Sequence, residues 1–391
     1  MTDRALFLKF MGQTSENPLL LKISHADGVY LFDDDGRRYL DLISGISVSY
    51  IGHRHPAVRK AIIEQTERHT HVMVYGEFIQ AAQLTYAQKL AELLPAGLES
   101  VYFVNSGSEA VEGALKLAKR FTGREEIIYF DKAYHGSTQG ALSVMGNEDL
   151  KRKFRPLLPG TVMLNFGEES GLDAISDRTA AVIIEPVQGE AGVRAAGDDY
   201  LRLLRRKCSG MGALLIFDEA QSAFGRTGKF LACGHSGVYP DILVLAKALG
   251  GGMPLGAFIS SGKIMSSLRS APAFGHITTF GGHPVSAAAG LAALNVLLDD
   301  RLMQGVPARE QLLREKLRHP GIREVRSAGL LAAVQLEDPG SVERVVQHCI
   351  SRGVLVDWFL FAPDCIRIAP PLIISEDQLE EGAAAILSGL G

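Results

Sequence analysis

The sequence predicts an α/β protein with a central, mostly parallel sheet and a smaller α+β domain. Short apolar runs recur through the middle of the chain, and none alternates between apolar and polar residues, which is typical of strands buried on both faces. Helical patterns separate several of these runs, and strand–helix alternation favours a doubly wound sheet. The expected strands are residues 101–104, 127–130, 181–184, 214–217 and 242–245.

The first of these strands leads into a predicted helix over residues 109–121. Apolar side chains recur there at helical spacing, at Val111, Ala114, Leu115 and Ala118. Near the N-terminus, residues 27–42 predict a hairpin around the turn sequence Asp35-Gly36.

The C-terminal third mixes helical patterns with short strands, which predicts the second domain. Helices are expected at 285–298 and 342–352, and strands at 330–336 and 365–368. We therefore divide the chain into an N-terminal segment (1–50) that joins the small domain, a large α/β domain (51–283) and a small α+β domain (284–391).

Net charge and cysteine content exclude several classes of function. Forty basic residues against 44 acidic ones give a net charge of −4, and no basic block is present, which argues against binding nucleic acid or an anionic membrane. Four scattered cysteines without a CxxC pair are typical of reduced thiols, and no signal peptide is evident, so we expect a cytoplasmic enzyme. The 42 glycines show no period, so each cluster requires its own explanation.

Polar residues follow the predicted strands where an α/β sheet places its chemistry. Strand 214–217 leads into Asp218, strand 181–184 into Glu185, and strand 242–245 into Lys247. Strand 101–104 leads into the tripeptide 106–108 (Ser-Gly-Ser), which opens a helix and offers backbone N–H groups to an anion such as phosphate. Taken singly, an acid or a serine in such a place is more often a helix cap, but four such strand ends converge in one domain.

Lys247 stands between a buried strand and three glycines, 250–252. Desolvation there lowers the pKa of an amine and makes it a nucleophile toward carbonyls, although a lysine at a strand end can also serve only to reach solvent. The nucleotide motif G-x-G-x-x-G and a P-loop are absent. With Asp218 as partner of a protonated ring nitrogen, the set describes pyridoxal 5'-phosphate.

Two His-x-His pairs, 53/55 and 69/71, raise the question of a metal. No further ligands follow at zinc spacing, and the His-Pro after Gly52 is typical of a turn, so we expect no metal site.

The chain resembles the class III (ω-) aminotransferases, a family of fold-type I pyridoxal-phosphate enzymes. The resemblance extends over nearly the whole chain and is greatest to the acetylornithine, ornithine and 4-aminobutyrate aminotransferases. Six segments carry it, in the family's order: FVNSGSEAVEGALKLAKR, AYHGSTQGALS, IIEPVQGEAGV, LLIFDEAQSAFGRTG, DILVLAKALGGGMPLGA and TTFGGHPVSAAAG.

The resemblance implies roles for residues around the cofactor. Lys247 matches the lysine that forms the Schiff base and moves the proton, and Asp218 the partner of the ring nitrogen. Thr279 matches a phosphate contact from the neighbouring subunit, which implies a homodimer. The remaining positions match the phosphate cup, the residue stacked on the ring, the group near the ring oxygen and a supporting carboxylate: Gly107 and Ser108, Tyr134, Gln221, and Glu185.

The resemblance also implies a substrate site. Arg367 matches the arginine that binds the substrate carboxylate in a bidentate manner, and Glu190 the glutamate that pairs with it while an ω-amine is bound. A purely structural ion pair is the alternative. Two positions depart from the pattern: Ser137 stands where many members carry an arginine for the far carboxylate, and Ile46 where ornithine aminotransferases carry a tyrosine. Both departures favour a less charged donor.

These observations predict a ping-pong aminotransferase that moves an amino group from an ω-amino acid or primary amine to an α-keto acid, with 2-oxoglutarate expected. An aminomutase of the glutamate-1-semialdehyde type or a dialkylglycine-type decarboxylase is the alternative within the fold. A non-catalytic ligand-binding α/β protein is the alternative outside it, and Lys247 argues against that class.

Overall fold

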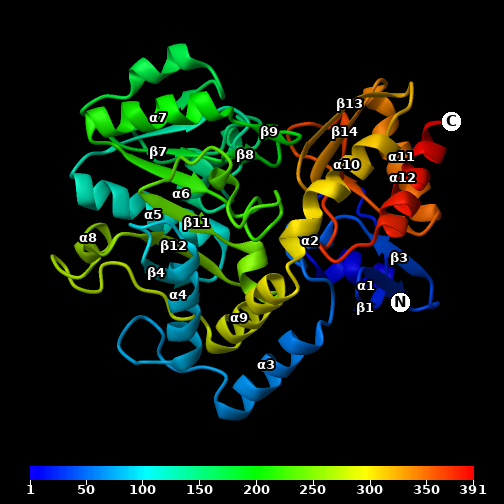
Figure 1. Ribbon diagram of the computed structural model, residues 1–391, viewed down its shortest axis with the longest axis horizontal. Coiled ribbons are helices and arrows are strands. Elements are labelled where there is room, and N and C mark those ends of the chain that lie inside the picture. Colours follow the sequence, from blue (N-terminus) through cyan, green and yellow to red (C-terminus); the bar gives the residue numbers. More distant parts are fainter.

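Seven strands form the central sheet, and all neighbouring pairs are parallel except those that involve β12 (Figure 1). The structure, a computed structural model, describes residues 1–391. In spatial order the strands are β4 (Ser100–Val104), β12 (Gly256–Ser260), β11 (Ile242–Leu245), β10 (Leu214–Asp218), β7 (Thr179–Ile184), β5 (Glu126–Phe130) and β6 (Thr161–Leu164). The mostly parallel sheet and its five expected strands are confirmed, whereas β6 and β12 were not predicted.

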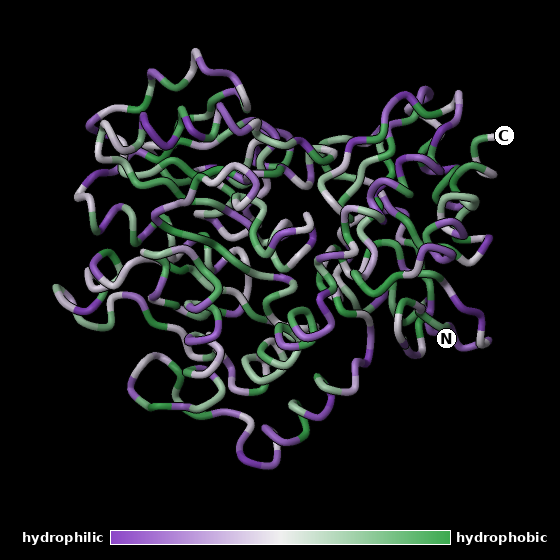
Figure 2. Tube along the Cα trace, viewed as in Figure 1, coloured by the Kyte–Doolittle hydropathy of each residue, from purple (hydrophilic) through white to green (hydrophobic).

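Both faces of this sheet are covered, as its uniformly apolar strands require. Along β5, Ile127 packs into one hydrophobic cluster and Ile128 into another, on opposite faces of the strand. One face is covered by α5 (Gly107–Thr122), whose buried side includes the four apolar positions predicted for that helix. The other face carries α7 (Asp198–Met211). Figure 2 shows hydrophobic residues along these strands and hydrophilic ones on the outer turns.

The N-terminal segment shares a sheet with the C-terminal third. The expected hairpin is confirmed as β2 (Tyr30–Asp33) and β3 (Arg38–Asp41), with β1 (Ile23–Asp27) on one edge. On the other edge, β15 (Val354–Leu355) pairs with β3 in parallel. A third sheet has the order β13 (Ile322–Ala328), β14 (Leu331–Leu336), β17 (Cys365–Ile368) and β16 (Asp357–Trp358). A short ribbon joins β8 (Val187–Gln188) to β9 (Arg194–Ala195).

Helix α9 (Pro284–Asp299) connects the two parts of the chain. It begins our expected small domain, yet it packs against α3 (Pro56–Arg68) and α4 (Ala81–Leu93) at the lower edge of Figure 1. Ten of its residues are buried, so it needs partners on several sides. The division of the chain at residues 50 and 283 stays a prediction.

The remaining helices lie toward the two ends of the chain or in connections. They are α1 (Asp3–Phe10), α2 (Ser44–Ser47), α6 (Gln139–Ser143), α8 (Gly262–Met265), α10 (Val306–Lys316), α11 (Val342–Ser351) and α12 (Glu376–Leu390). Helices α9 and α11 confirm the two helices expected in the C-terminal third. None of the helices has the length and apolar character needed to cross a membrane.

Candidate active site

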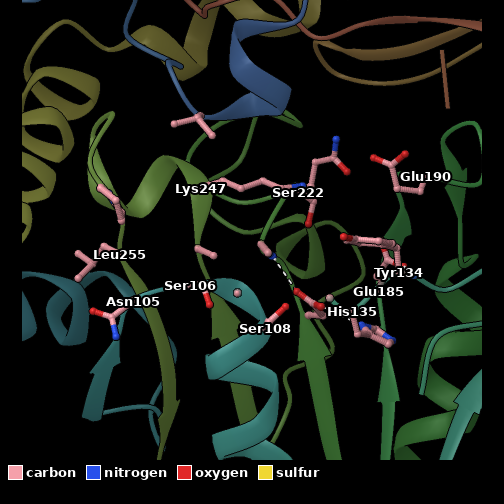
Figure 3. Close-up of a pocket in the computed structure, with 18 of the residues that line it drawn as sticks. Asn105, Ser106, Ser108, Tyr134, His135, Glu185, Glu190, Ser222, Lys247 and Leu255 are labelled. Atoms are coloured by element: carbon pink, nitrogen blue, oxygen red, sulfur yellow. Dashed lines mark hydrogen bonds and ion pairs between the residues drawn. The ribbon is translucent and has the colours of Figure 1, made fainter. Parts of the chain in front are cut away.

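A cavity of about 430 Å³ opens where the parallel strands end (Figure 3). Its wall includes residues at or just after the ends of β4, β10, β7 and β11, namely Ser108, Asp218, Glu185 and Lys247. The strand-end residues singled out from the sequence therefore do converge. Others from the predicted set also line this cavity: Gly107, Tyr134, Glu190 and Gln221.

The first turn of α5 forms one end of the cavity. Ser106 caps the helix, and its Oγ accepts a hydrogen bond from the backbone N–H of Glu109 at 3.2 Å. The next N–H groups, at Gly107 and Ser108, belong to the helix end that has no intrahelical acceptor. Helix capping and anion binding are thus compatible here. Ser106 caps the helix, and the N–H groups of the residues that follow it can bind an anion.

Gly136 brings the neighbouring turn against this helix end. Its φ is +124°, and a Cβ there would lie 1.9 Å from Oγ of Ser108. The same hydroxyl accepts the backbone N–H of Ser137 at 3.1 Å. This close approach places Tyr134 and His135 beside the start of α5.

Lys247 follows β11 in a left-handed conformation, with φ of +50°. Figure 3 shows its side chain extending across the cavity. Burial lowers the pKa of its ammonium group, and the Arg367 guanidinium lowers it further, while nearby carboxylates such as Glu190 oppose the shift. The amine is therefore closer to its neutral, nucleophilic form than a surface lysine is.

Asp218 is held by a histidine that the sequence analysis did not single out. Nδ1 of His135 lies 2.8 Å from one carboxylate oxygen, and the backbone N–H of Ala220 donates to the other at 3.0 Å. The two bonds fix the plane of the carboxylate. His135 could have been found from the sequence, because it lies between Tyr134 and Gly136 in the segment AYHGSTQGALS, which resembles the family.

Glu185 accepts two backbone hydrogen bonds rather than pairing with a cation. The N–H of Tyr134 donates to Oε1 at 2.9 Å, and the N–H of Gly189 donates to Oε2 at 3.1 Å. Burial raises the pKa of this carboxyl group to about 7, and the charge of Asp218 adds to the shift. Glu185 thus fastens the backbone of Tyr134 to the end of β7.

Pyridoxal phosphate fits the donors that face this cavity. Nε2 of Gln221 is buried and has no hydrogen-bond partner in the protein, so a ligand acceptor, such as a ring oxygen, would satisfy it. A helix N-terminus suits the phosphate, and Asp218 offers a carboxylate for a ring nitrogen.

Arg367 and Glu190 form a bidentate ion pair beside the cavity. Nη1 lies 2.6 Å from Oε1 and Nη2 lies 3.2 Å from Oε2. Arg367 is on β17, and Glu190, which lines the cavity, is in the turn after β8. The two residues are 177 positions apart in the chain, and the fold brings them together as expected.

Besides Arg367, three predicted residues lie outside the set that lines this cavity. The side chain of Ser137 is exposed, and its Oγ lies 3.3 Å from the hydroxyl of Tyr134. Ile46 is half-buried in a left-handed turn, and Val48, two residues further on, lines the cavity. Thr279 is exposed and does not reach the cavity of its own chain.

The first histidine pair, 53/55, has other partners. Nε2 of His53 lies 2.8 Å from Oδ2 of Asp41, and His55 caps helix α3 through a bond from the N–H of Ala57.

Comparison with known proteins identifies the class. The family model described as Aminotransferase class-III matches residues 11–390. The acetylornithine aminotransferase of Methanopyrus kandleri is 41% identical over 369 residues, covering 93% of this chain and 92% of that protein. The acetylornithine aminotransferase of Mycobacterium tuberculosis is 40% identical, covering 94% and 90%.

Solved structures agree with these relatives. The ornithine aminotransferase of Toxoplasma gondii superposes with a TM-score of 0.91 at 30% identity, covering 99% of this chain and 94% of that one. A transaminase from the marine bacterium Virgibacillus gives a TM-score of 0.93 at 26% identity, covering 99% and 97%.

The fold is therefore that of a fold-type I pyridoxal-phosphate enzyme. The chain belongs to the class-III aminotransferase family and is a pyridoxal-phosphate-dependent aminotransferase.

Proposed function

We propose that the enzyme takes an amino group from an ω-amino acid or a primary amine and passes it to 2-oxoglutarate in a ping-pong reaction. The observation that carries this proposal is the Arg367–Glu190 pair beside Lys247. A carboxylate-binding arginine that already has a carboxylate partner suits a site that must accept substrates with and without an α-carboxylate.

Different residues of the cavity would bind different parts of the cofactor. The start of α5 would bind the phosphate, Tyr134 would stack on the ring, and Gln221 would donate to the ring oxygen. When bound, pyridoxal phosphate supplies an electron sink for the carbon that loses its proton. Asp218, oriented by His135, would keep the ring nitrogen protonated.

Lys247 would act both as nucleophile and as base. Its lowered pKa, caused by burial, provides a neutral amine that would bind the cofactor's carbonyl carbon. Once the donor's nitrogen has displaced it from that carbon, the freed amine would accept a proton from the donor carbon. The same group would then deliver a proton to the cofactor, so it serves both proton steps.

Arg367 would select between the two half-reactions. With Glu190 in place the guanidinium is neutralised, and an amine without an α-carboxylate meets no unpaired charge. In the second half-reaction the carboxylate of 2-oxoglutarate would replace Glu190 on the same nitrogen atoms, because both groups match the guanidinium fork.

The donor itself is the less defined substrate. The relatives above act by name on acetylornithine and ornithine. Ser137 replaces the arginine expected for the far carboxylate of such donors, and a hydroxyl offers no counter-charge. We therefore propose donors of this shape with a less charged far end.

We further propose a cytoplasmic homodimer in which Thr279 contacts the partner's cofactor. A second cavity is lined by apolar residues around Phe78 and Ile79 together with Thr278, the neighbour of Thr279. Ile79 is 92% exposed, and Phe78 and Phe280 are each more than half exposed. Apolar side chains gathered in this way are typical of a surface that a second chain covers.

A coupled assay tests the proposal. Purified enzyme loaded with pyridoxal phosphate and supplied with 2-oxoglutarate should form glutamate from at least one member of a panel of ω-amino acids and primary amines. Lys247→Ala should form none and should lose the visible absorption band of the lysine-bound cofactor. Absence of glutamate with every donor would favour the aminomutase or decarboxylase alternative.

A further inference from the structure

Arg367 has a second acidic partner besides Glu190. Asp357 lies directly opposite Arg367 in the antiparallel pairing of β16 and β17. Its Oδ1 accepts a hydrogen bond from Nε of Arg367 at 3.0 Å. The carbonyl of Trp358 accepts another from Nη2 at 2.6 Å, and the ring of Phe359 lies 4.7 Å from the guanidinium carbon. Two acids therefore share one buried guanidinium.

The two acids bind different edges of the guanidinium. Asp357 accepts a hydrogen bond from Nε, whereas Glu190 accepts hydrogen bonds from Nη1 and Nη2. The edge that Glu190 covers is the one a substrate carboxylate would need for bidentate binding. The edge that Asp357 covers is not required for that exchange.

The two acids also differ in how firmly they are held. Asp357 is part of a strand pair, so its backbone is fixed opposite that of Arg367. Glu190 belongs to the turn between β8 and β9, where Gly189 and Gly192 flank it. Apart from Arg367, its carboxylate accepts one hydrogen bond, from the backbone N–H of Leu360 at 3.2 Å. A side chain on such a turn can leave its partner with less disturbance than one on a paired strand.

A buried arginine needs a counter-ion at every stage of the reaction. The side chain of Arg367 is 3% exposed, and a guanidinium left alone at that depth is strongly destabilised. If Glu190 were its only acid, the arginine would be unpaired whenever Glu190 had moved away and no substrate carboxylate was yet bound. Asp357 removes that difficulty, since it remains on Nε while the other edge is open.

We propose that Asp357 is the permanent partner of Arg367 and Glu190 the exchangeable one, which makes Asp357 a positioning residue for the substrate carboxylate. This inference rests on the proposed function, in which that carboxylate replaces Glu190. The negative charge of Asp357 repels Glu190 and the incoming carboxylate alike, so it does not bias the exchange. Its contribution is a counter-ion that stays in place and orients the guanidinium.

Two substitutions separate orientation from charge. Asp357→Ala removes the acceptor for Nε and should raise the KM for 2-oxoglutarate at least about tenfold, with kcat little changed. Asp357→Asn keeps an oxygen opposite Nε but removes the counter-ion, so its KM should lie between those of the wild type and Asp357→Ala. The kcat/KM for a donor without an α-carboxylate should be the same in all three proteins, because that donor does not use Arg367.

Asp364 provides a matched control. It lies at the other end of the same hairpin, bonded to Gln335 and without a hydrogen bond to Arg367. Asp364→Ala should leave the KM for 2-oxoglutarate unchanged. Equal effects of Asp357→Ala on the acceptor and on the simple amine, or no effect on the acceptor, would overturn the inference.

A binding measurement makes the test independent of turnover. Trp358 is the only tryptophan of the chain and follows Asp357 directly, so its fluorescence can report glutarate binding to the holoenzyme. The dissociation constant should rise most in Asp357→Ala, rise less in Asp357→Asn, and stay unchanged in Asp364→Ala. If the wild type forms no glutamate, the proposed function fails, whereas unaltered glutarate binding in Asp357→Ala refutes the role of Asp357.

Discussion

At the scale of single residues, Arg367 illustrates how one side chain serves a site through its shape. Its guanidinium holds Glu190 through two nitrogen atoms while a third nitrogen holds Asp357. A lysine in the same place would keep the positive charge that both acids need but would offer a single point of contact. The fork, rather than the charge, is therefore what the proposed carboxylate site depends on.

Arg367→Lys should raise the KM for 2-oxoglutarate by about 10- to 100-fold, because a bidentate, charge-assisted contact becomes monodentate. The KM for a donor without an α-carboxylate should change little. Steady-state kinetics with both substrates checks this. Parallel changes in the two constants would mean that the ion pair is structural.

Glu185 predicts a dependence of stability on pH. Its pKa of about 7 lies above the ordinary value of 4.5, since burial disfavours the charged form. Below pH 4.5 the group is protonated in both the folded and the unfolded chain, so it does not lower the free energy of unfolding. Between pH 4.5 and 7 the unfolded chain has released a proton that the folded protein still holds, so the free energy of unfolding falls by about 3.5 kcal/mol, at about 1.4 kcal/mol per pH unit.

Glu185→Gln removes this charge, so the cofactor-free variant should gain stability relative to the wild type as the pH increases from 5 to 8. Denaturant midpoints of both proteins at the two pH values measure the difference. The glutamine loses one backbone hydrogen bond at either pH, which shifts both midpoints equally. A difference that does not vary with pH would contradict the raised pKa.

At the scale of elements, the strands could be predicted from the sequence and several contacts could not. Five central strands are continuous apolar runs, so the local sequence is enough to predict them. Strand β12 begins with Gly256, a residue with low strand propensity, which is needed because a Cβ there would lie 2.2 Å from the carbonyl oxygen of Ser106. Gly256 is therefore explained by a tertiary contact with Ser106, which strand propensity does not reveal.

The site shows the same division. Lys247 and Asp218 could be found because each follows a strand, and the parallel sheet brings strand ends together. The bond from His135 to Asp218 spans 83 residues, and that from Arg367 to Asp357 depends on strand register. Neither leaves a periodic pattern in the sequence, so the structure was needed to find them.

The turn around Gly136 predicts how two elements depend on each other. Gly136→Ala places a methyl group against Oγ of Ser108 and strains a backbone with φ of +124°. The turn that carries Tyr134 and the start of α5 must then separate. We expect the affinity for pyridoxal phosphate to fall at least about tenfold, measured by reconstitution of cofactor-free protein.

Gly123→Ala is the matched control, because Gly123 also has positive φ, at the other end of α5, but faces open space. It should lower stability without changing cofactor affinity. Equal losses of affinity in both variants would attribute the effect to the helix as a whole rather than to the turn.

At the scale of the whole molecule, the proposed dimer predicts that two defective chains can restore each other. Thr279 is exposed and lies outside the cavity of its own chain, whereas Lys247 lies within it. If Thr279 contacts the partner's cofactor, each site combines Lys247 of one chain with Thr279 of the other. Lys247→Ala and Thr279→Asp then damage different halves of a site.

Co-expression of the two variants tests this arrangement. Thr279→Asp alone should be weakly active because its carboxylate repels the phosphate, and Lys247→Ala alone should be inactive. In a mixed dimer one site carries both defects and the other carries none. With random pairing half the dimers are mixed, so the preparation should reach about a quarter of wild-type activity. Activity no greater than that of Thr279→Asp alone would mean that each chain completes its own site, and the dimer would then owe its existence to the apolar surface around Ile79 rather than to catalysis.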